Sequence, residues 1–171
     1  MRVRLLAIDM DGTCLNPRSK ISEQTMKALK ACADSGVMIV PTTDTIRQSN
    51  GVLEELQFYF LSRAAKGNVR DIMKNFPKLT AAYDRSYVEI FSRDASKGNA
   101  LSALSSYLQI DPGQVACIGD GENDLSLFQA ADIKFAMGNA VPDLKAAADY
   151  VLPSNKDDGV AYAIDNYILP V

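Results

Sequence analysis

The chain has 171 residues, 47% of them hydrophobic, which is enough for one buried core and a small insertion. A net charge of −3 gives no broad basic surface for a nucleic-acid backbone. The apolar runs are far shorter than the ~20 residues that span a bilayer, and Asp9 and Asp11 interrupt the N-terminal one. We therefore expect a cytoplasmic protein with no nucleic-acid or membrane partner.

Histidine and cysteine usage narrows the chemistry further. The sequence contains no histidine, which excludes Ser-His and Cys-His triads and histidine-bound metals. Cys14, Cys32 and Cys117 are far apart and form no CxxC pair, so we expect buried thiols rather than a disulfide framework or a zinc site. Carboxylates, hydroxyls and lysines must carry any reaction.

The N-terminal segment is typical of a strand followed by a helix. The nearly continuous apolar run over 3–8 predicts a buried parallel strand, with Asp9 at its carboxyl end, where α/β sheets bind ligands. Ser22 as an N-cap and Gly36 as a stop signal predict a helix over 22–35.

The apolar run over 37–40 predicts a second buried strand. Pro41 lacks the N–H that a strand ladder uses, so we expect the strand to end there. Thr43 then lies just past the tip of this strand, as Asp9 does for the first.

Residues 44–95 break the alternation of strands and helices. Strand-like stretches at 58–61 and 87–91 flank a helix-like stretch at 68–75. We interpret this segment as an insertion.

Residues 96–171 resume the alternation. We expect a helix from 96, a strand at 115–118, a short helix after 123, a strand at 133–137, a helix from 142, a strand at 150–152 and a last helix at 157–168. This order predicts an α/β fold with a doubly wound parallel sheet.

The run Asp9-Met10-Asp11-Gly12-Thr13 is the clearest chemical signal. Side chains at i and i+2 share a face in extended chain, and Gly12 permits a sharp turn afterwards. One carboxylate can attack phosphorus while its neighbour moves the proton. Two close carboxylates repel each other, which indicates a bound Mg²⁺ and a raised pKa for one of them. Taken alone, the run is equally typical of an ordinary acidic loop or a calcium-binding turn.

Further polar groups follow at predicted strand ends and helix starts. Thr43 and Asp120 each follow a strand, and Lys97 lies at a helix N-terminus, where its charge opposes the helix dipole. The alternatives are ordinary ones: a turn-capping Thr43, a solvated Lys97, and Asp120 and Asp124 as cap and first-turn residues of a helix.

In this order, the motifs resemble those of the haloacid dehalogenase superfamily, specifically its Cof-type phosphatase branch. The resemblance covers 1–43 and 86–165 and implies a Rossmann-like core of 1–43 and 96–171, with helices on both faces of the sheet. The matching segments are Asp9-Met10-Asp11-Gly12-Thr13, Thr43 after its strand, Ser96-Lys97-Gly98-Asn99-Ala100-Leu101, Gly119-Asp120-Gly121-Glu122-Asn123-Asp124, Ala136-Met137-Gly138-Asn139-Ala140 and Asp157-Asp158-Gly159-Val160-Ala161.

The resemblance also implies a role for each residue. Asp9 would attack phosphorus to form an aspartyl-phosphate, and Asp11 would protonate the leaving alcohol and later activate water. Mg²⁺ would be held by the carboxylates of Asp9 and Asp120, by the backbone carbonyl of Asp11 and, less directly, by Asp124. The phosphate-binding residues would be Thr43, Lys97 and Asn123.

The sequence departs from this branch at two places. Asp44-Thr45 stands where the branch usually has Gly-Arg, and only residues 44–96 separate the second and third motifs, too few for the branch's full cap. We therefore interpret 44–95 as a small, truncated α+β cap, arising either naturally or by internal deletion. A reduced cap leaves the site open, so we expect either that a second subunit covers the site or that the strand edge of the cap pairs with its counterpart in a homodimer.

The predicted function is Mg²⁺-dependent hydrolysis of small phosphate monoesters such as sugar phosphates or phosphoglycolate. A phosphomutase or phosphotransferase of the same fold would differ only in the group that accepts the phosphoryl. A second alternative is an interaction protein that keeps this fold and has lost turnover along with its cap. The expected partner is a small phosphorylated metabolite.

Overall fold

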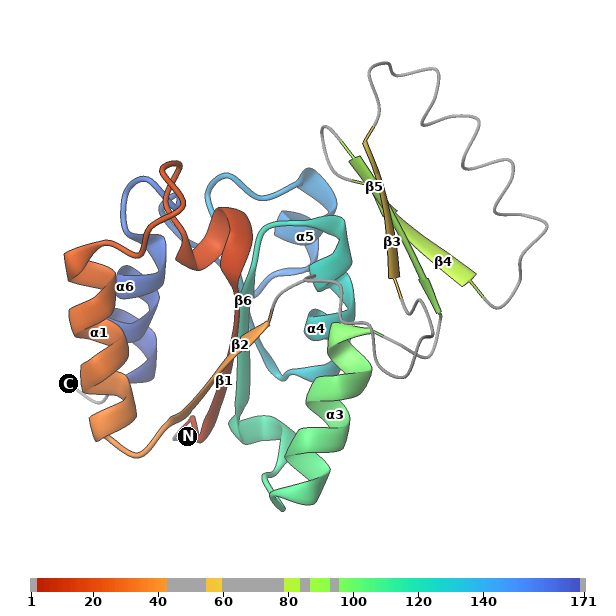
Figure 1. Ribbon diagram of the computed structural model, residues 1–171. Coiled ribbons are helices and arrows are strands. Elements are labelled where there is room, and N and C mark those ends of the chain that lie inside the picture. Colours follow the sequence, from red (N-terminus) through yellow and green to blue (C-terminus); the bar gives the residue numbers. More distant parts are fainter. Residues whose placement is uncertain (1–2, 43–54, 60–78, 84–86, 93–95, 170–171) are drawn as a thin grey trace. The chain divides into compact units, whose positions relative to one another are not determined.

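A computed structural model describes residues 3–42, 55–59, 79–83, 87–92 and 96–169 of the chain (Figure 1). The chain divides into two compact units, residues 1–43 with 97–171, and residues 44–96. Each unit is described by itself below.

The larger unit is built on a five-stranded parallel sheet in the order β2-β1-β6-β7-β8. Its strands are β1 (Leu5–Asp9), β2 (Met38–Thr42), β6 (Val115–Gly119), β7 (Ile133–Ala136) and β8 (Tyr150–Val151). The predicted α/β fold with a parallel sheet is thereby confirmed. All residues of β1 and β6 are buried, as expected of central strands covered on both faces.

Helices cover both faces of this sheet. In Figure 1, α1 and α6 lie on one side, and α3 and α4 lie on the other. The α-helices are α1 (Glu23–Asp34), α3 (Lys97–Tyr107), α4 (Leu125–Ala130), α5 (Pro142–Ala147) and α6 (Gly159–Ala163), and short turns are η1 (Met10–Cys14), η2 (Pro112–Gln114), η3 (Glu122–Asp124) and η4 (Ile164–Ile168). The core between these layers includes Leu5, Ile118 and Phe135, all fully or almost fully buried.

Helix α1 begins and ends as its sequence predicts. The Ser22 hydroxyl oxygen accepts a hydrogen bond from the Thr25 N–H at 3.0 Å, which satisfies one of the unpaired donors of the first turn. Gly36 has a φ of +89° just beyond the helix, a conformation that glycine adopts without steric cost.

The second strand differs from its prediction in two respects: it ends later, and it is not buried, since its residues are half-buried or exposed. Pro41 does not end the second strand; β2 continues through Pro41 to Thr42, and Pro41 pairs in register with Ile8. The reason is position, because β2 lies at an edge of the described sheet, where a residue without an N–H is tolerated. The longer strand places Thr42 beside Asp9.

The smaller unit contains a three-stranded antiparallel sheet in the order β3-β5-β4. Strand β5 (Tyr87–Ser92) lies where a strand is predicted, whereas β3 (Glu55–Tyr59) only overlaps the prediction of 58–61. Strand β4 (Leu79–Tyr83) is not predicted, because its alanines have low β-propensity. The predicted helix at 68–75 falls outside the described residues.

Within the part of the chain that the structure describes, none of the helices has the length and apolar character needed to cross a bilayer.

Candidate active site

Asp9 occupies the carboxyl end of β1, and the backbone turns sharply after it. Its side chain is buried, and η1 closes the turn with a hydrogen bond from the Leu15 N–H to the Met10 carbonyl at 2.8 Å. Gly12 has a φ of +81°, and a Cβ at this position would lie 2.3 Å from Oδ2 of Asp120. Glycine is therefore required at position 12 on two grounds, its backbone conformation and its close approach to Asp120.

Lys97, the first residue of α3, reaches two of the carboxylates. Its Nζ donates hydrogen bonds to Oδ1 of Asp9 at 2.8 Å and to Oδ1 of Asp124 at 3.0 Å. The lysine side chain is only 9% exposed, so it does not occupy a solvated first-turn position. The buried ammonium offsets part of the negative charge that burial of the carboxylates concentrates here.

Asp120 and Asp124 follow β6 and are held in different ways. Asp124 is fully buried, and its Oδ2 accepts the N–H groups of Asp120 at 2.9 Å and Gly121 at 3.0 Å. Asp120 is half-buried, and its Oδ1 accepts the Thr13 hydroxyl at 2.9 Å. Its Oδ2 accepts the side-chain amide of Asn139 at 3.1 Å.

Asp9, Asp120 and Asp124 form the carboxylate cluster. Each contributes one oxygen to a set whose atoms all lie within 4.8 Å of one another. An all-oxygen donor set without thiolate or imidazole suits a hard cation, so these residues fit Mg²⁺. Burial raises the pKa of Asp9, the charges of Asp124 and Asp120 raise it further, and Lys97 opposes the rise. A cation between the carboxylates would relieve this repulsion.

The other predicted site residues fall in three places. Asp11 lies on η1 with an exposed side chain, and Asn123 is half-buried in η3, where its carbonyl accepts the Ser126 hydroxyl at 3.1 Å. Thr43 lies outside the described residues. Its neighbour Thr42 pairs in register with Asp9 and has a buried hydroxyl oxygen with no hydrogen-bond partner in the described part of the chain.

Two contacts at the site are missing from the sequence predictions. Thr13 and Asn139 both bind the Asp120 carboxylate. Each residue lies in a segment that carries the family resemblance, but neither is given a role of its own. Their distance from Asp120 in the sequence leaves no local spacing signal that would pair them with it.

The three cysteines are buried thiols, as predicted. Burial raises the pKa of Cys32 to about 11, and burial together with the charge of Asp9 raises the pKa of Cys14 to about 11. The pKa of Cys117 is raised further, chiefly by burial. Protonated thiols are weak nucleophiles at neutral pH.

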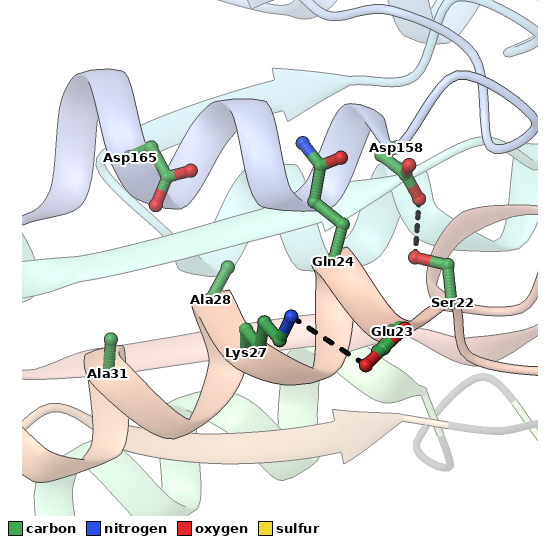
Figure 2. Close-up of a pocket in the computed structure, with 8 residues that line it drawn as sticks. All are labelled: Ser22, Glu23, Gln24, Lys27, Ala28, Ala31, Asp158 and Asp165. Carbon is green, nitrogen blue, oxygen red and sulfur yellow. Dashed lines mark hydrogen bonds and ion pairs between the residues drawn. The ribbon is translucent and has the colours of Figure 1, made fainter.

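A separate groove of about 700 Å³ lies away from the carboxylate cluster. Figure 2 shows Ala28 and Ala31 of α1 facing the segment that carries Asp158 and Asp165. Asp158 accepts hydrogen bonds there from the hydroxyls of Ser22 at 2.5 Å and Thr25 at 3.3 Å. These contacts tie the start of α1 to the start of α6, which is a structural role.

The fold and the cluster define an α/β protein whose carboxylates and lysine meet at the carboxyl ends of parallel strands. The chain belongs to the haloacid dehalogenase-like hydrolase family, whose model matches residues 6–69 and 58–164. A solved haloacid dehalogenase-like hydrolase from Bacillus subtilis superposes with a TM-score of 0.88 over 96% of this chain and 100% of its own. At 19% identity, that likeness shows the fold alone.

Curated relatives are similar over much of the sequence. The phosphoglycolate phosphatase of Sulfurisphaera tokodaii is 32% identical over 134 residues, 78% of this chain and 58% of its own length. A phosphoglycolate phosphatase of Methanothermobacter thermautotrophicus is 24% identical over 221 residues, covering 97% of this chain and 99% of that relative. That alignment is longer than the 171 residues present here, so the relative has internal positions without a counterpart. The chain spans 31% to 58% of the length of the Sulfurisphaera tokodaii relative and three further curated relatives.

Proposed function

We propose that the protein is a Mg²⁺-dependent phosphoric monoester hydrolase that forms an aspartyl-phosphate on Asp9. One observation carries the proposal: the buried Asp9 carboxylate is hydrogen-bonded to Lys97 and lies within a few ångströms of Asp120 and Asp124. A nucleophile, a fixed positive charge and an all-oxygen cation site meet at the carboxyl ends of the neighbouring strands β1 and β6. Membership of the family and the names of the relatives support the same reaction class.

The first step transfers the phosphoryl group to the enzyme. Lys97 holds Oδ1 of Asp9, so Oδ2 attacks the phosphorus. The bond from phosphorus to the ester oxygen breaks, and Asp11 gives its proton to the departing alkoxide. The products of this step are a free alcohol and a phosphorylated Asp9.

The second step regenerates the enzyme. Asp11, now a carboxylate, takes a proton from water, and the resulting hydroxide attacks the phosphorus of the aspartyl-phosphate. The acyl-phosphate bond breaks at phosphorus, which releases inorganic phosphate and frees the Asp9 carboxylate. An exposed Asp11 is suited to this exchange, since its side chain can meet both the leaving alcohol and the entering water.

The remaining site residues act electrostatically. Lys97 stabilises the negative charge that spreads over the phosphoryl oxygens, with Thr43 and Asn123 as further donors. Asp9, Asp120, the Asp11 carbonyl and, less directly, Asp124 would hold Mg²⁺, which would supply positive charge beside the transferring group. Burial of Asp9 and Lys97 strengthens both effects, because fewer waters screen them.

The substrate class that we propose is small phosphorylated metabolites, with phosphoglycolate and sugar phosphates first. Two relatives carry the name phosphoglycolate phosphatase, which supports this choice. A phosphomutase would return the phosphoryl group to a sugar hydroxyl instead of water. Product analysis with a sugar phosphate separates the two, since only the hydrolase releases inorganic phosphate in proportion to the substrate consumed.

A panel of monoesters that includes p-nitrophenyl phosphate, phosphoglycolate and sugar phosphates tests the function. We expect phosphate release with Mg²⁺, little with EDTA, and none from Asp9→Asn. Full activity in Asp9→Asn would rule out the mechanism. No release of phosphate from the entire panel would favour an interaction protein that keeps this fold.

We further propose that the smaller unit is a reduced cap through which two chains pair. Among the described strands of this unit, β3 and β4 lie at the edges of the sheet, and a strand edge can add a strand from a second copy. A dimer measured by light scattering would support this arrangement, and a strict monomer at high concentration would overturn it.

A further inference from the structure

Asn139 contacts two segments of the candidate site at once. It lies in the loop between β7 and α5, and its Nδ2 donates to the Gly12 carbonyl at 2.8 Å and to Oδ2 of Asp120 at 3.1 Å. The two N–H bonds of one amide therefore link the turn after β1 to the carboxylate after β6.

The orientation of this amide follows from its third contact. The Asn155 N–H donates to Oδ1 of Asn139 at 2.9 Å, and a backbone N–H can only donate. The amide oxygen must therefore face Asn155, and the amide nitrogen must face the two acceptors. The reverse orientation would oppose donor to donor at Asn155 and acceptor to acceptor at both Gly12 and Asp120.

The Asp120 carboxylate is held on both of its oxygens. Thr13 donates to Oδ1 and Asn139 donates to Oδ2, so the two donors fix the rotation of the carboxylate plane. Both donors are neutral, so neither of them cancels the negative charge of Asp120. Asp124, by contrast, gives one oxygen to a charged lysine.

We propose that Asn139 is a positioning residue that sets the Asp120 carboxylate and the Gly12 turn for the binding of Mg²⁺. The inference rests on the proposed function, since it concerns the cation that the carboxylate cluster would hold. Without the amide, the Asp120 carboxylate can rotate and the turn after β1 loses one hydrogen bond. Binding of the cation must then also order both groups, which weakens the affinity. Loss of such a supporting contact typically weakens metal affinity by about 10–100-fold.

The side chain of Asn155 offers a matched control. Its Nδ2 donates to the Leu15 carbonyl at 2.8 Å, so Asn155→Ala removes a loop tether of the same kind. The backbone N–H that orients Asn139 remains in that variant. Asn139→Leu complements Asn139→Ala, because leucine fills a similar volume and donates no hydrogen bond.

The test measures the midpoint of Mg²⁺ binding, obtained by fitting the dependence of the thermal unfolding temperature on Mg²⁺ concentration after bound metal and then the EDTA have been removed. This readout needs no turnover. We expect the midpoint to increase about 10–100-fold in Asn139→Ala and Asn139→Leu and to stay near the wild-type value in Asn155→Ala. At saturating Mg²⁺, the two Asn139 variants should recover most of their phosphatase activity.

Three results would overturn the inference. Wild-type midpoints in both Asn139 variants would show that the amide does not position the site. Failure of both variants to fold while Asn155→Ala folds would assign Asn139 a purely structural role. Absence of any Mg²⁺-dependent shift in the wild type would remove the metal from the proposed function, and this inference would fail with it.

Discussion

Acidic side chains gather in two regions of the larger unit, and their surroundings differ. The carboxylate cluster brings Asp9, Asp120 and Asp124 together at the ends of β1 and β6. The groove between α1 and α6 is lined by Glu23, Asp158 and Asp165 among others (Figure 2). The number of acidic residues is the same, so composition alone does not distinguish a reactive site from a structural one.

The difference lies in burial and in the partners of each carboxylate. In the cluster, oxygens of three carboxylates from two chain segments converge on one another and on a lysine that is 9% exposed. In the groove, Glu23 pairs with Lys27 at 3.6 Å on one turn of α1, and both side chains are largely exposed. Such a surface pair contributes little to stability, whereas the cluster concentrates charge at a cost that a bound cation can offset.

The largest difference that we expect is in stability, between variants of Lys97 and Lys27. Lys97→Met removes the ammonium group that the buried Asp9 and Asp124 share. In the absence of metal, this change should lower the free energy of unfolding by about 3–5 kcal/mol. Lys27→Met, the matched change in the groove, should alter it by less than about 0.5 kcal/mol. Urea denaturation in EDTA measures both, and similar losses in the two variants would contradict the distinction.

A second comparison uses two glycines that both have positive φ. Gly12→Ala places a methyl group against Asp120 and should lower phosphatase activity by about 100-fold, since small displacements at a reacting centre are costly. Gly36→Ala lies at the end of α1 and should cost about 1–2 kcal/mol of stability while activity is retained. Steady-state kinetics and thermal unfolding of both variants measure this contrast, and an active Gly12→Ala would refute it.

The smallest effect concerns Asp158 in the groove. Asp158→Ala removes the acceptor of the Ser22 and Thr25 hydroxyls and should cost about 1–2 kcal/mol of stability without changing activity or the Mg²⁺ midpoint. Asp158→Asn keeps an acceptor oxygen and tolerates the φ of +56° at this position, so most of the stability should remain. A loss of activity in either variant, measured with Mg²⁺ at saturation, would mean that the two acidic regions are coupled.

Much of the fold can be predicted from the sequence, because buried parallel strands appear as short apolar runs and helices are marked by capping residues. The Asp9 strand, helix α1 and the strand before Asp120 lie where they are predicted. The predicted end of β2 is wrong, because whether a strand tolerates Pro41 depends on the position of that strand in the sheet. The alanines of β4 give no strand signal, so this strand is found only through its pairing with β5.

Less of the candidate site could be predicted from the sequence. Acidic residues and a lysine at strand and helix ends are visible in sequence, and the structure brings Asp9, Lys97, Asp120 and Asp124 together. The contacts of Thr13 and Asn139 with Asp120 are not, since 107 and 19 residues separate the partners. The contacts that orient the Asp120 carboxylate are set by tertiary packing, for which a local sequence pattern gives no signal.

Phosphorylation of Asp9 is the central claim, and acid quenching tests it most directly. A monoester that the panel shows to be turned over is labelled with ³²P, mixed with the protein and Mg²⁺, and quenched within the first turnover. We predict acid-stable, hydroxylamine-sensitive label on the peptide that contains Asp9, and none in Asp9→Asn. Rapid turnover with label on another residue, or equal labelling of Asp9→Asn, would contradict the account.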